Sequence, residues 1–330
     1  MLASMNIAQH RIDLSDRSLA MVWIGVALVS VIASAAAPIV AFIVMISAFG
    51  LPHVIYELRY CDERFSARAP VRLLGVLGAL VGTIALLRIA NGAHWITGPM
   101  FVPIELGLGA ALALVAAYAM KERRLLGALV GLAFAFGATF YPIETFVAWA
   151  WLHNLTPLGF VAEITQGQER RRWLLLLSIP FFILPALVAT GAFRELALFA
   201  LGMPDLQTAS VFGAGETPLL SFLPPGSSNL NLFSAAVVAQ SMHYVAVIVL
   251  LPRLLQAKQG VMVSPTLVPW PGWRVFGFGV AFIAVLAFGL YSISYTDARA
   301  AYGVAAAIHA WLELPVLLLA LGQGFRSERI

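Results

Sequence analysis

The sequence is poor in charged residues and almost free of cysteine. Only 11% of its 330 residues are charged and 61% are hydrophobic, whereas a soluble domain has about 25% charged and 45–50% apolar residues. A water-soluble fold of this length cannot hide so much apolar surface, because surface area does not shrink fast enough with size. The only cysteine, Cys61, excludes an intramolecular disulfide and a cysteine metal cluster. These shortages indicate an all-α protein embedded in a lipid bilayer.

Several motifs of soluble enzymes are also missing. The chain has no Walker phosphate-binding loop, no Gly-x-Gly-x-x-Gly after a strand, no nucleophile elbow and no Cys-x-x-Cys-His haem attachment. The first 17 residues, with Arg11, Asp13, Asp16 and Arg17, are too polar for the core of a signal peptide. We therefore expect the first apolar run to be a retained helix.

Apolar runs long enough to cross a bilayer are abundant. A spanning helix needs about 20 predominantly apolar residues. Ten stretches are close to this length: 19–36, 38–57, 73–90, 101–120, 125–140, 142–161, 174–191, 232–251, 275–293 and 301–321. The expected fold is a polytopic transmembrane helical bundle of about ten spans. It forms one domain, residues 19–321, with short tails at 1–18 and 322–330.

The distribution of positive charge predicts the orientation of this bundle. If the N-terminus is cytoplasmic, 17 of the 20 Lys and Arg residues fall in cytoplasmic segments, and only Arg88, Arg194 and Arg299 lie near outer ends. Cytoplasmic loops are enriched in Lys and Arg, so both termini are predicted to be cytoplasmic. We expect a multi-pass protein of a bacterial inner membrane. The basic balance then reflects topology, and no nucleic-acid partner is expected.

The outer segment 192–231 is the longest connection between the predicted spans. Loops of this length are usually functional or disordered, and this one is rich in proline and glycine. Its first part, residues 193–203, has the composition of a short amphipathic helix on the membrane surface. Two acidic residues, Glu105 and Glu144, lie near outer helix ends, where we expect interfacial positions.

Four histidines lie inside predicted spans, where ionisable groups are costly and by default mark a function. They are His53, His153, His243 and His309, on the second, sixth, eighth and tenth spans. All four spans run inward, and the histidines lie roughly 12–22 Å below the outer boundary at 1.5 Å per residue. Four imidazoles at a common depth on different helices could bind a metal ion in the bundle interior.

Two of these histidines are followed by a glutamate four residues later. Glu57 follows His53 and Glu313 follows His309, a spacing that places both side chains on one helix face. A carboxylate beside a metal-bound histidine can orient the ring or bind the metal itself. In addition, Pro157 frees the carbonyl of His153 from its backbone hydrogen bond, and broken helices are tolerated at membrane depth where they line protein or water.

The run Gly-Leu-Pro-His-Val-Ile-Tyr-Glu-Leu at residues 50–58 resembles the opening motif of the Brp/Blh-like family, membrane enzymes that cleave β-carotene to retinal. In that family an Asp follows the motif histidine by four residues, and Glu57 occupies this position here. The resemblance implies a multi-span protein with several intramembrane histidines and iron chemistry on a carotenoid. The family's later pair of histidines one helical turn apart is absent, since His243 and His309 stand on separate spans.

The sequence thus predicts a membrane-embedded metalloenzyme, a non-haem iron oxygenase acting on a lipophilic carotenoid or isoprenoid that enters from the lipid. The four buried histidines would be the ligands. Glu57 and Glu313 would act in catalysis by balancing the positive charge of the metal from positions next to the histidine ligands. Copper or zinc also suits imidazole ligands. Three alternatives remain: a haem-binding electron carrier, a proton- or metal-coupled transporter that uses the His/Glu pairs, and histidines that only hydrogen-bond between helices.

Overall fold

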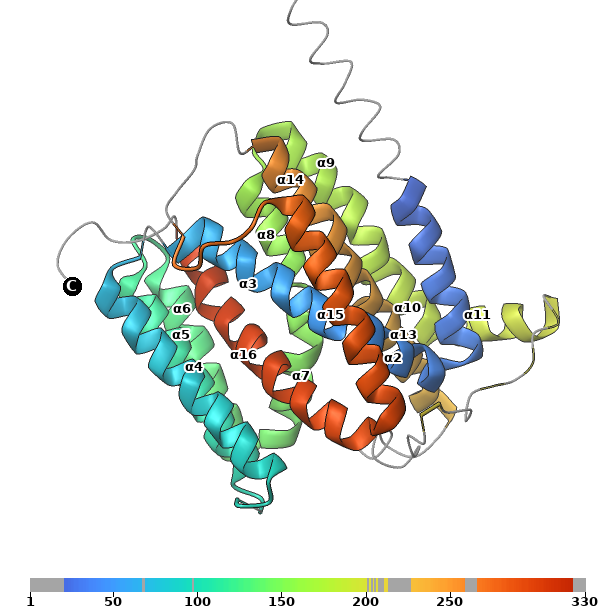
Figure 1. The fold of residues 1–330 in the computed structure, drawn as a ribbon, viewed down its shortest axis with the longest axis horizontal. Helices are drawn as coiled ribbons and strands as arrows, with labels where there is room; N and C mark the ends of the chain where they lie inside the picture. Colours follow the sequence, from blue (N-terminus) through green and yellow to red (C-terminus); the bar gives the residue numbers. More distant parts are fainter. Residues whose placement is uncertain are drawn as a thin grey trace, which may run out of the picture.

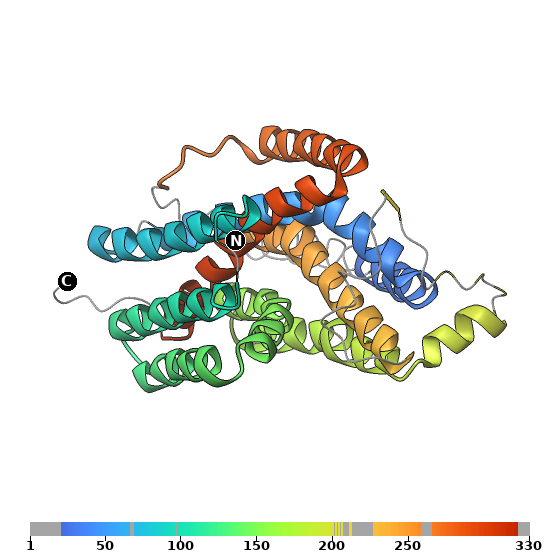
Figure 2. The ribbon, with the colours of Figure 1, turned by 90° about the horizontal axis from the view of Figure 1, so that it is seen from below.

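The computed structural model describes residues 21–66, 69–96, 98–200, 202, 204, 206, 211–212, 227–258 and 266–322. The described residues are 87% helical, and no β-strand occurs among them. In chain order the helices are Met21–Ala36, α2 (Pro38–Met45), η1 (Ile46–Gly50), α3 (Leu51–Phe65), α4 (Val71–Gly92), α5 (Phe101–Ala119), α6 (Arg124–Phe140), α7 (Pro142–His153), α8 (Thr156–Ile164), α9 (Gly167–Ser178), η3 (Ile179–Ile183), α10 (Leu184–Ala189), α11 (Ala192–Glu195), η4 (Leu196–Ala200), α13 (Ser227–Val245), η5 (Ala246–Leu250), α14 (Leu251–Lys258), α15 (Trp273–Ile293) and α16 (Tyr295–Leu321). Figures 1 and 2 show them as one bundle in two views.

Seven of these helices are long and apolar enough to cross a membrane: Pro38–Phe65, Val71–Gly92, Phe101–Ala119, Gly167–Ala189, Leu230–Ala257, Trp273–Ile293 and Tyr295–Leu321. Each contains most or all of one predicted span. The other three predicted spans are shorter: 19–36 and 125–140 match Met21–Ala36 and Arg124–Phe140, and 142–161 is divided between α7 and α8. The count of ten spans therefore stays a prediction. Apart from Gly322, the predicted tails lie outside the described residues.

Three of the long helices contain a π-helical turn, and each turn ends two residues before a proline. The turns are η1, η3 and η5, and the prolines are Pro52, Pro185 and Pro252. Proline has no N–H, and its ring clashes with the carbonyl four residues earlier. A wider turn accommodates that clash without ending the helix. Such turns are frequent at functional sites, and η1 and η5 lie close in the chain to His53 and His243.

Helix α16 lies at the centre of the arrangement, where it crosses α3 (Figure 1). It packs against α3, α4, α5, α8 and α15. Two apolar clusters flank this region: one joins α4, α5 and α16 around Trp311, and the other joins α8, α9 and α13 around Phe160 and Met242. The packing therefore places α16 against α3, the helix that carries another of the predicted histidines.

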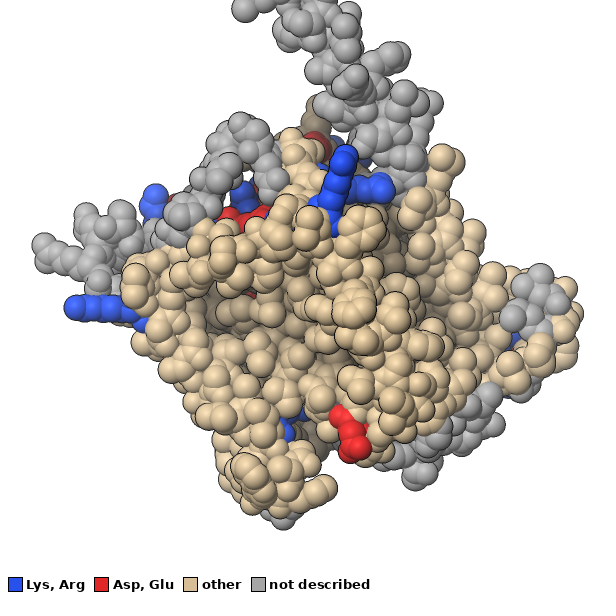
Figure 3. All heavy atoms as spheres, in the orientation of Figure 1, with Lys and Arg blue, Asp and Glu red and all other residues tan. Residues whose placement is uncertain are grey.

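Contacts at one end of the bundle join segments that the charge distribution assigns to the cytoplasmic side. Asp62, at the end of α3, accepts hydrogen bonds from the backbone N–H groups of Leu267 and Val268, both 2.9 Å, and from Trp270 Nε1. Arg64 forms an ion pair with Glu163 at the end of α8. In the view of Figure 3 this end of the bundle is at the top, where most of the charged side chains lie, above a broad uncharged band.

Glu105, which the sequence places near an outer helix end, is enclosed by protein and is not an exposed interfacial side chain. Its side chain is fully buried between α4, α5 and α16, where Arg88 Nε lies 2.7 Å from one carboxylate oxygen and Trp311 Nε1 donates to the other at 2.8 Å. Buried carboxylates require such partners. Sequence position gave no sign of it, because Trp311 lies 206 residues away.

The predicted outer segment 192–231 begins with a short projecting helix. Residues 192–200 are helical as α11 and η4, which extend from the side of the bundle (Figure 1). The helical start agrees with the expectation for residues 193–203. Most of the segment from 201 to 226 lies outside the described residues.

Candidate metal centre

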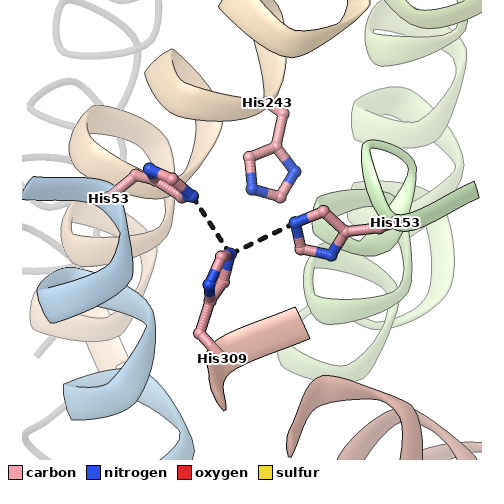
Figure 4. A group of neighbouring side chains, drawn as sticks. All are labelled: His53, His153, His243 and His309. Atoms are coloured by element: carbon pink, nitrogen blue, oxygen red, sulfur yellow. Dashed lines mark hydrogen bonds between the residues drawn. The ribbon is translucent and has the colours of Figure 1, made fainter. Parts of the chain in front are cut away.

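The four predicted histidines meet in the interior of the bundle. His53 comes from α3, His153 from the end of α7, His243 from α13 and His309 from α16. Their rings face one shared space (Figure 4). One ligand nitrogen from each lies within 4.8 Å of the others. His53, His243 and His309 are at most 2% exposed, so the sequence correctly identified residues that the fold brings together.

His53 and His309 are held in the same way by their own helices. His53 Nδ1 lies 3.1 Å from the carbonyl oxygen of Phe49, and His309 Nδ1 lies 3.3 Å from that of Ala305. A carbonyl only accepts hydrogen bonds, so Nδ1 carries the proton in both rings. The lone pair of each neutral imidazole is then on Nε2, which faces the shared space.

The Nε2 atoms of three rings converge. His309 Nε2 lies 3.1 Å from His53 Nε2 and 3.2 Å from His153 Nε2 (Figure 4). Since Nδ1 holds the proton in His53 and His309, no hydrogen is available between their two Nε2 atoms while both rings are neutral. Two nitrogens on one ion, at about 2.0–2.1 Å from it and at tetrahedral or right angles, lie about 2.8–3.4 Å apart. The observed separations fall in that range.

His153 ends its helix, as the following proline predicts. Helix α7 stops at His153, and α8 begins at Thr156 with Pro157 in its first turn. The freed carbonyl of His153 accepts a hydrogen bond from Thr156 Oγ1 at 2.8 Å. The break lets His153 Nε2 face His309 while Nδ1 lies 2.8 Å from Glu313 Oε2, a close contact outside hydrogen-bond angles. The predicted span 142–161 is therefore two helices, and the carbonyl that Pro157 frees lies at the break between them.

His243 differs from the other three histidines. It is completely buried, and neither ring nitrogen has a hydrogen-bond partner within the described part of the chain. Its Nε2 lies 3.6 Å from Glu57 Oε2. A buried polar group without a partner is destabilising, so an additional binding partner would be most favourable at this ring.

The two glutamates pair with histidines of other helices and not with those of their own motifs. Glu313 lies beside His153, and Glu57 lies beside His243 and 4.0 Å from His309 Nε2. His53 and His309 already use Nδ1 for the carbonyl one turn earlier, so they have no N–H left for the glutamate one turn later. The i,i+4 spacing therefore placed the carboxylates at the centre correctly, but their partners are across the bundle.

The polar groups form two overlapping sets of possible ligands. One is the four histidines, and the other is Glu57, His243, His309 and Glu313, again within 4.8 Å of one another. Both carboxyl groups are fully buried and interact with each other, and none of their four oxygens makes a hydrogen bond of standard geometry among the described residues. Buried carboxylates without compensation are strongly destabilising. A cation bound here would offset their charge, and the cluster could hold a metal ion.

Sequence reasoning missed one aromatic residue at this centre. The ring of Tyr244 stacks on that of His53, with centroids 4.0 Å apart and planes 23° from parallel. Its hydroxyl accepts a 2.6 Å hydrogen bond from Gln240 and lies 3.0 Å from the hydroxyl of Tyr302. The Tyr302 ring packs on the backbone of Gly50, where an added Cβ would lie 2.9 Å away. The only available signal was that Tyr244 directly follows His243.

Comparisons with family models, with characterised proteins and with solved structures find no match to this chain.

Proposed function

We propose that this protein is a membrane-embedded metalloenzyme, a non-haem iron oxygenase with a lipophilic substrate. Seven helices suited to a membrane surround a buried cluster of four histidines and two glutamates. The observation that carries the proposal is the convergence of three Nε2 atoms at 3.1 and 3.2 Å, with the Nδ1 protons of His53 and His309 directed away to carbonyls. This is the arrangement of neutral imidazoles that a metal ion requires.

The residues suit one divalent ion. His53, His153, His243 and His309 would supply nitrogen ligands, which suit iron, copper or zinc. Two carboxylates would neutralise two positive charges. His309 belongs to both ligand sets, and its only free lone pair, on Nε2, can bind one ion. The two sets therefore cannot each hold an ion at the same time, which favours one ion per chain. Iron bound here would supply oxygen activation.

The protein's own contribution is to orient the ligands and to exclude water. The carboxylate of Glu313 lies 2.8 Å from Nδ1 of His153, and its charge favours a proton on Nδ1 and the lone pair on Nε2, toward the ion. Glu57 places negative charge beside the Nε2 atoms of His243 and His309. The buried rings and the apolar clusters around α16 keep the site dry, which strengthens electrostatic interactions inside it.

A haem-binding function fits this geometry poorly. Two imidazole nitrogens on opposite faces of a haem iron lie about 4 Å apart, twice a metal–nitrogen distance of about 2.0 Å. His53 Nε2 and His309 Nε2 are 3.1 Å apart, with their rings nearly perpendicular. The transporter alternative has no comparable observation in its favour.

The substrate proposed is a carotenoid or another isoprenoid. Its support is the resemblance of residues 50–58 to the Brp/Blh-like motif and the apolar surroundings of the site. Such a molecule would enter sideways from the lipid, since the outer faces of the long helices are apolar and exposed, as at Phe278 and Phe282 on α15.

Metal content of the detergent-purified protein tests the proposal. We expect about one iron ion per chain by mass spectrometry, and loss of that ion in the double variant His53→Ala, His309→Ala, because two of the converging nitrogens are removed. The matched control is His94→Ala, which removes an exposed histidine in the loop after α4 and should leave the metal content unchanged.

Three results would argue against the proposed site. Full metal retention in the double variant would exclude the histidine cluster as the binding site. Two ions per chain would indicate a dinuclear centre in which Glu57 and Glu313 are ligands. A Soret absorption band in the purified protein would identify a haem protein instead.

A further inference from the structure

A cavity of about 520 Å³ lies beside the metal centre. It is lined by residues of three helical segments that also carry metal-site histidines: Phe42 and Ile46 before α3, Gln240 on α13, and Tyr295, Thr296, Arg299, Ala300, Tyr302 and Gly303 on α16; Arg88, Asn91 and Gly92 of α4 complete it. Its size is typical of a site for a small molecule. It is distinct from the cluster of histidines.

The lining is positively charged at one end. Arg88 and Arg299 both line the cavity, and no acidic side chain does so in the described part of the chain. Arg88 is compensated by Glu105, which lies behind it at 2.7 Å. Arg299 therefore leaves an excess of one positive charge in a lining that also contains the amide of Asn91. Guanidinium and amide donors together bind an anionic group with several oxygens.

The other end of the cavity approaches the metal centre. On α16, Arg299 is ten residues before His309, or about 15 Å at 1.5 Å per residue, and Tyr302 is about 10 Å before it. Gln240 is only one turn before His243 on α13. The hydroxyl of Tyr302 contacts that of Tyr244, whose ring stacks on His53. Tyr302 and Tyr244 thus separate the cavity from a metal-site histidine.

We propose that this cavity binds the anionic head of a long-chain amphiphile, with Arg299 as the residue that selects the charge and the chain directed past Tyr302 toward the histidines. Phe42 and Ile46 provide apolar contact for the first part of the chain. Fixing the head about 15 Å from His309 along α16 would determine which part of a chain lies at the metal. The direction of the chain rests on the proposed metalloenzyme function, whereas binding of the head does not.

Equilibrium binding of palmitate to the detergent-solubilised full chain tests this proposal. We expect Arg299→Gln to weaken palmitate binding by about tenfold or more, because a charge-assisted hydrogen bond is lost. Arg253→Gln, which removes an exposed arginine of α14, should leave binding unchanged. Hexadecanol should bind the parent protein more weakly than palmitate, and inorganic phosphate should compete poorly, because one lacks the charge and the other lacks the chain.

A second variant tests the cavity without changing its charge. An added Cβ at Gly303 meets nothing within 4 Å, so Gly303→Phe should fill the cavity and reduce palmitate binding. Gly289→Phe is the control, since Gly289 on α15 is equally open and does not line the cavity. Equal palmitate binding in Gly303→Phe and Gly289→Phe, or in Arg299→Gln and Arg253→Gln, would overturn the proposal. So would hexadecanol or phosphate binding as tightly as palmitate.

The metal content of the same variants separates the two proposals. Arg299→Gln and Gly303→Phe should retain the metal of the parent protein, because neither touches a histidine of the centre. Palmitate binding by a protein that holds no metal would support the cavity and refute the metalloenzyme. A metal-loaded protein that binds no palmitate would support the metal site and refute the proposed function of the cavity.

Discussion

At the scale of single residues, the protonated nitrogen of each histidine decides what that histidine can do. Phe49 and Ala305 accept from Nδ1 of His53 and His309, and this leaves Nε2 as the free lone pair. Glu313, whose Oε2 lies 2.8 Å from Nδ1 of His153 outside hydrogen-bond angles, favours the same state in that ring through its charge. A carbonyl and a carboxylate are not equivalent in this role, because the carboxylate also raises the basicity of the ring.

Glu313→Gln should weaken metal binding without abolishing it. The carboxylate lies at the far nitrogen of His153, so its charge acts through the ring, and such losses typically amount to about 10–100-fold in affinity. Competition with a chelator of known affinity measures the change. The control is Glu144→Gln, which alters an exposed glutamate of α7, and an unchanged affinity in Glu313→Gln would show that the contact does not orient the ligand.

Glu57→Gln should have the larger effect. Glu57 Oε2 lies 3.6 Å and 4.0 Å from the Nε2 atoms of His243 and His309, on the side of the rings that faces the shared space. A neutral amide there is a poorer ligand and does not offset the charge of the ion. We expect metal loss close to that of the histidine double variant. If Glu57→Gln retains more metal than Glu313→Gln, the assignment of the two carboxylates is reversed.

At the scale of helices, small residues allow the close packing that positions the buried groups. Gly109 on α5 faces the indole of Trp311, and an added Cβ would lie 2.1 Å from that ring. The same indole donates to Glu105. The close approach of α5 to α16 therefore depends on the absence of a side chain at one position, as is common between membrane helices.

Gly109→Val should destabilise the fold by about 1–3 kcal/mol, the usual cost of overpacking. Displacing Trp311 would also remove a hydrogen bond from the buried Glu105. Gly107→Val, on the same helix with nothing within 4 Å of the added carbon, should be close to neutral. Reversible unfolding in mixed detergent compares the two variants, and equal stabilities would show that α5 and α16 are not packed in this way.

At the scale of the whole molecule, one end of the bundle gathers the loops that the positive charges assign to the cytoplasm. Asp62 is bonded to the segment before α15, and the N–H of Glu122 donates to the carbonyl of Gly322 at 3.1 Å. The loops after α3, after α5 and before α15 therefore share one end with the end of α16. The predicted topology requires these segments to lie on one side of the membrane; that this side is cytoplasmic stays a prediction.

Reporter fusions test that orientation. Fusions after residues 66, 122, 169 and 258 should give cytoplasmic signals, and fusions near residues 94 and 215 should give external signals, because 17 of 20 basic residues are then cytoplasmic. A cytoplasmic signal at residue 215 would exclude the ten-span topology. The directions in which the seven long helices cross the membrane would then have to be assigned again.

The sequence by itself determined the helical class, the positions of the long apolar helices, the four histidines of the cluster and the carbonyl of His153 that Pro157 frees. These features depend on composition, on apolar run length and on proline, which act locally along the chain. It could not determine that Glu313 pairs with His153, that Glu57 lies beside His243, that Glu105 is buried, or that Tyr244 stacks on His53. Those contacts join residues far apart in the sequence, and they depend on how each helix is rotated about its axis. Packing between helices sets that rotation, so only the tertiary structure decided them.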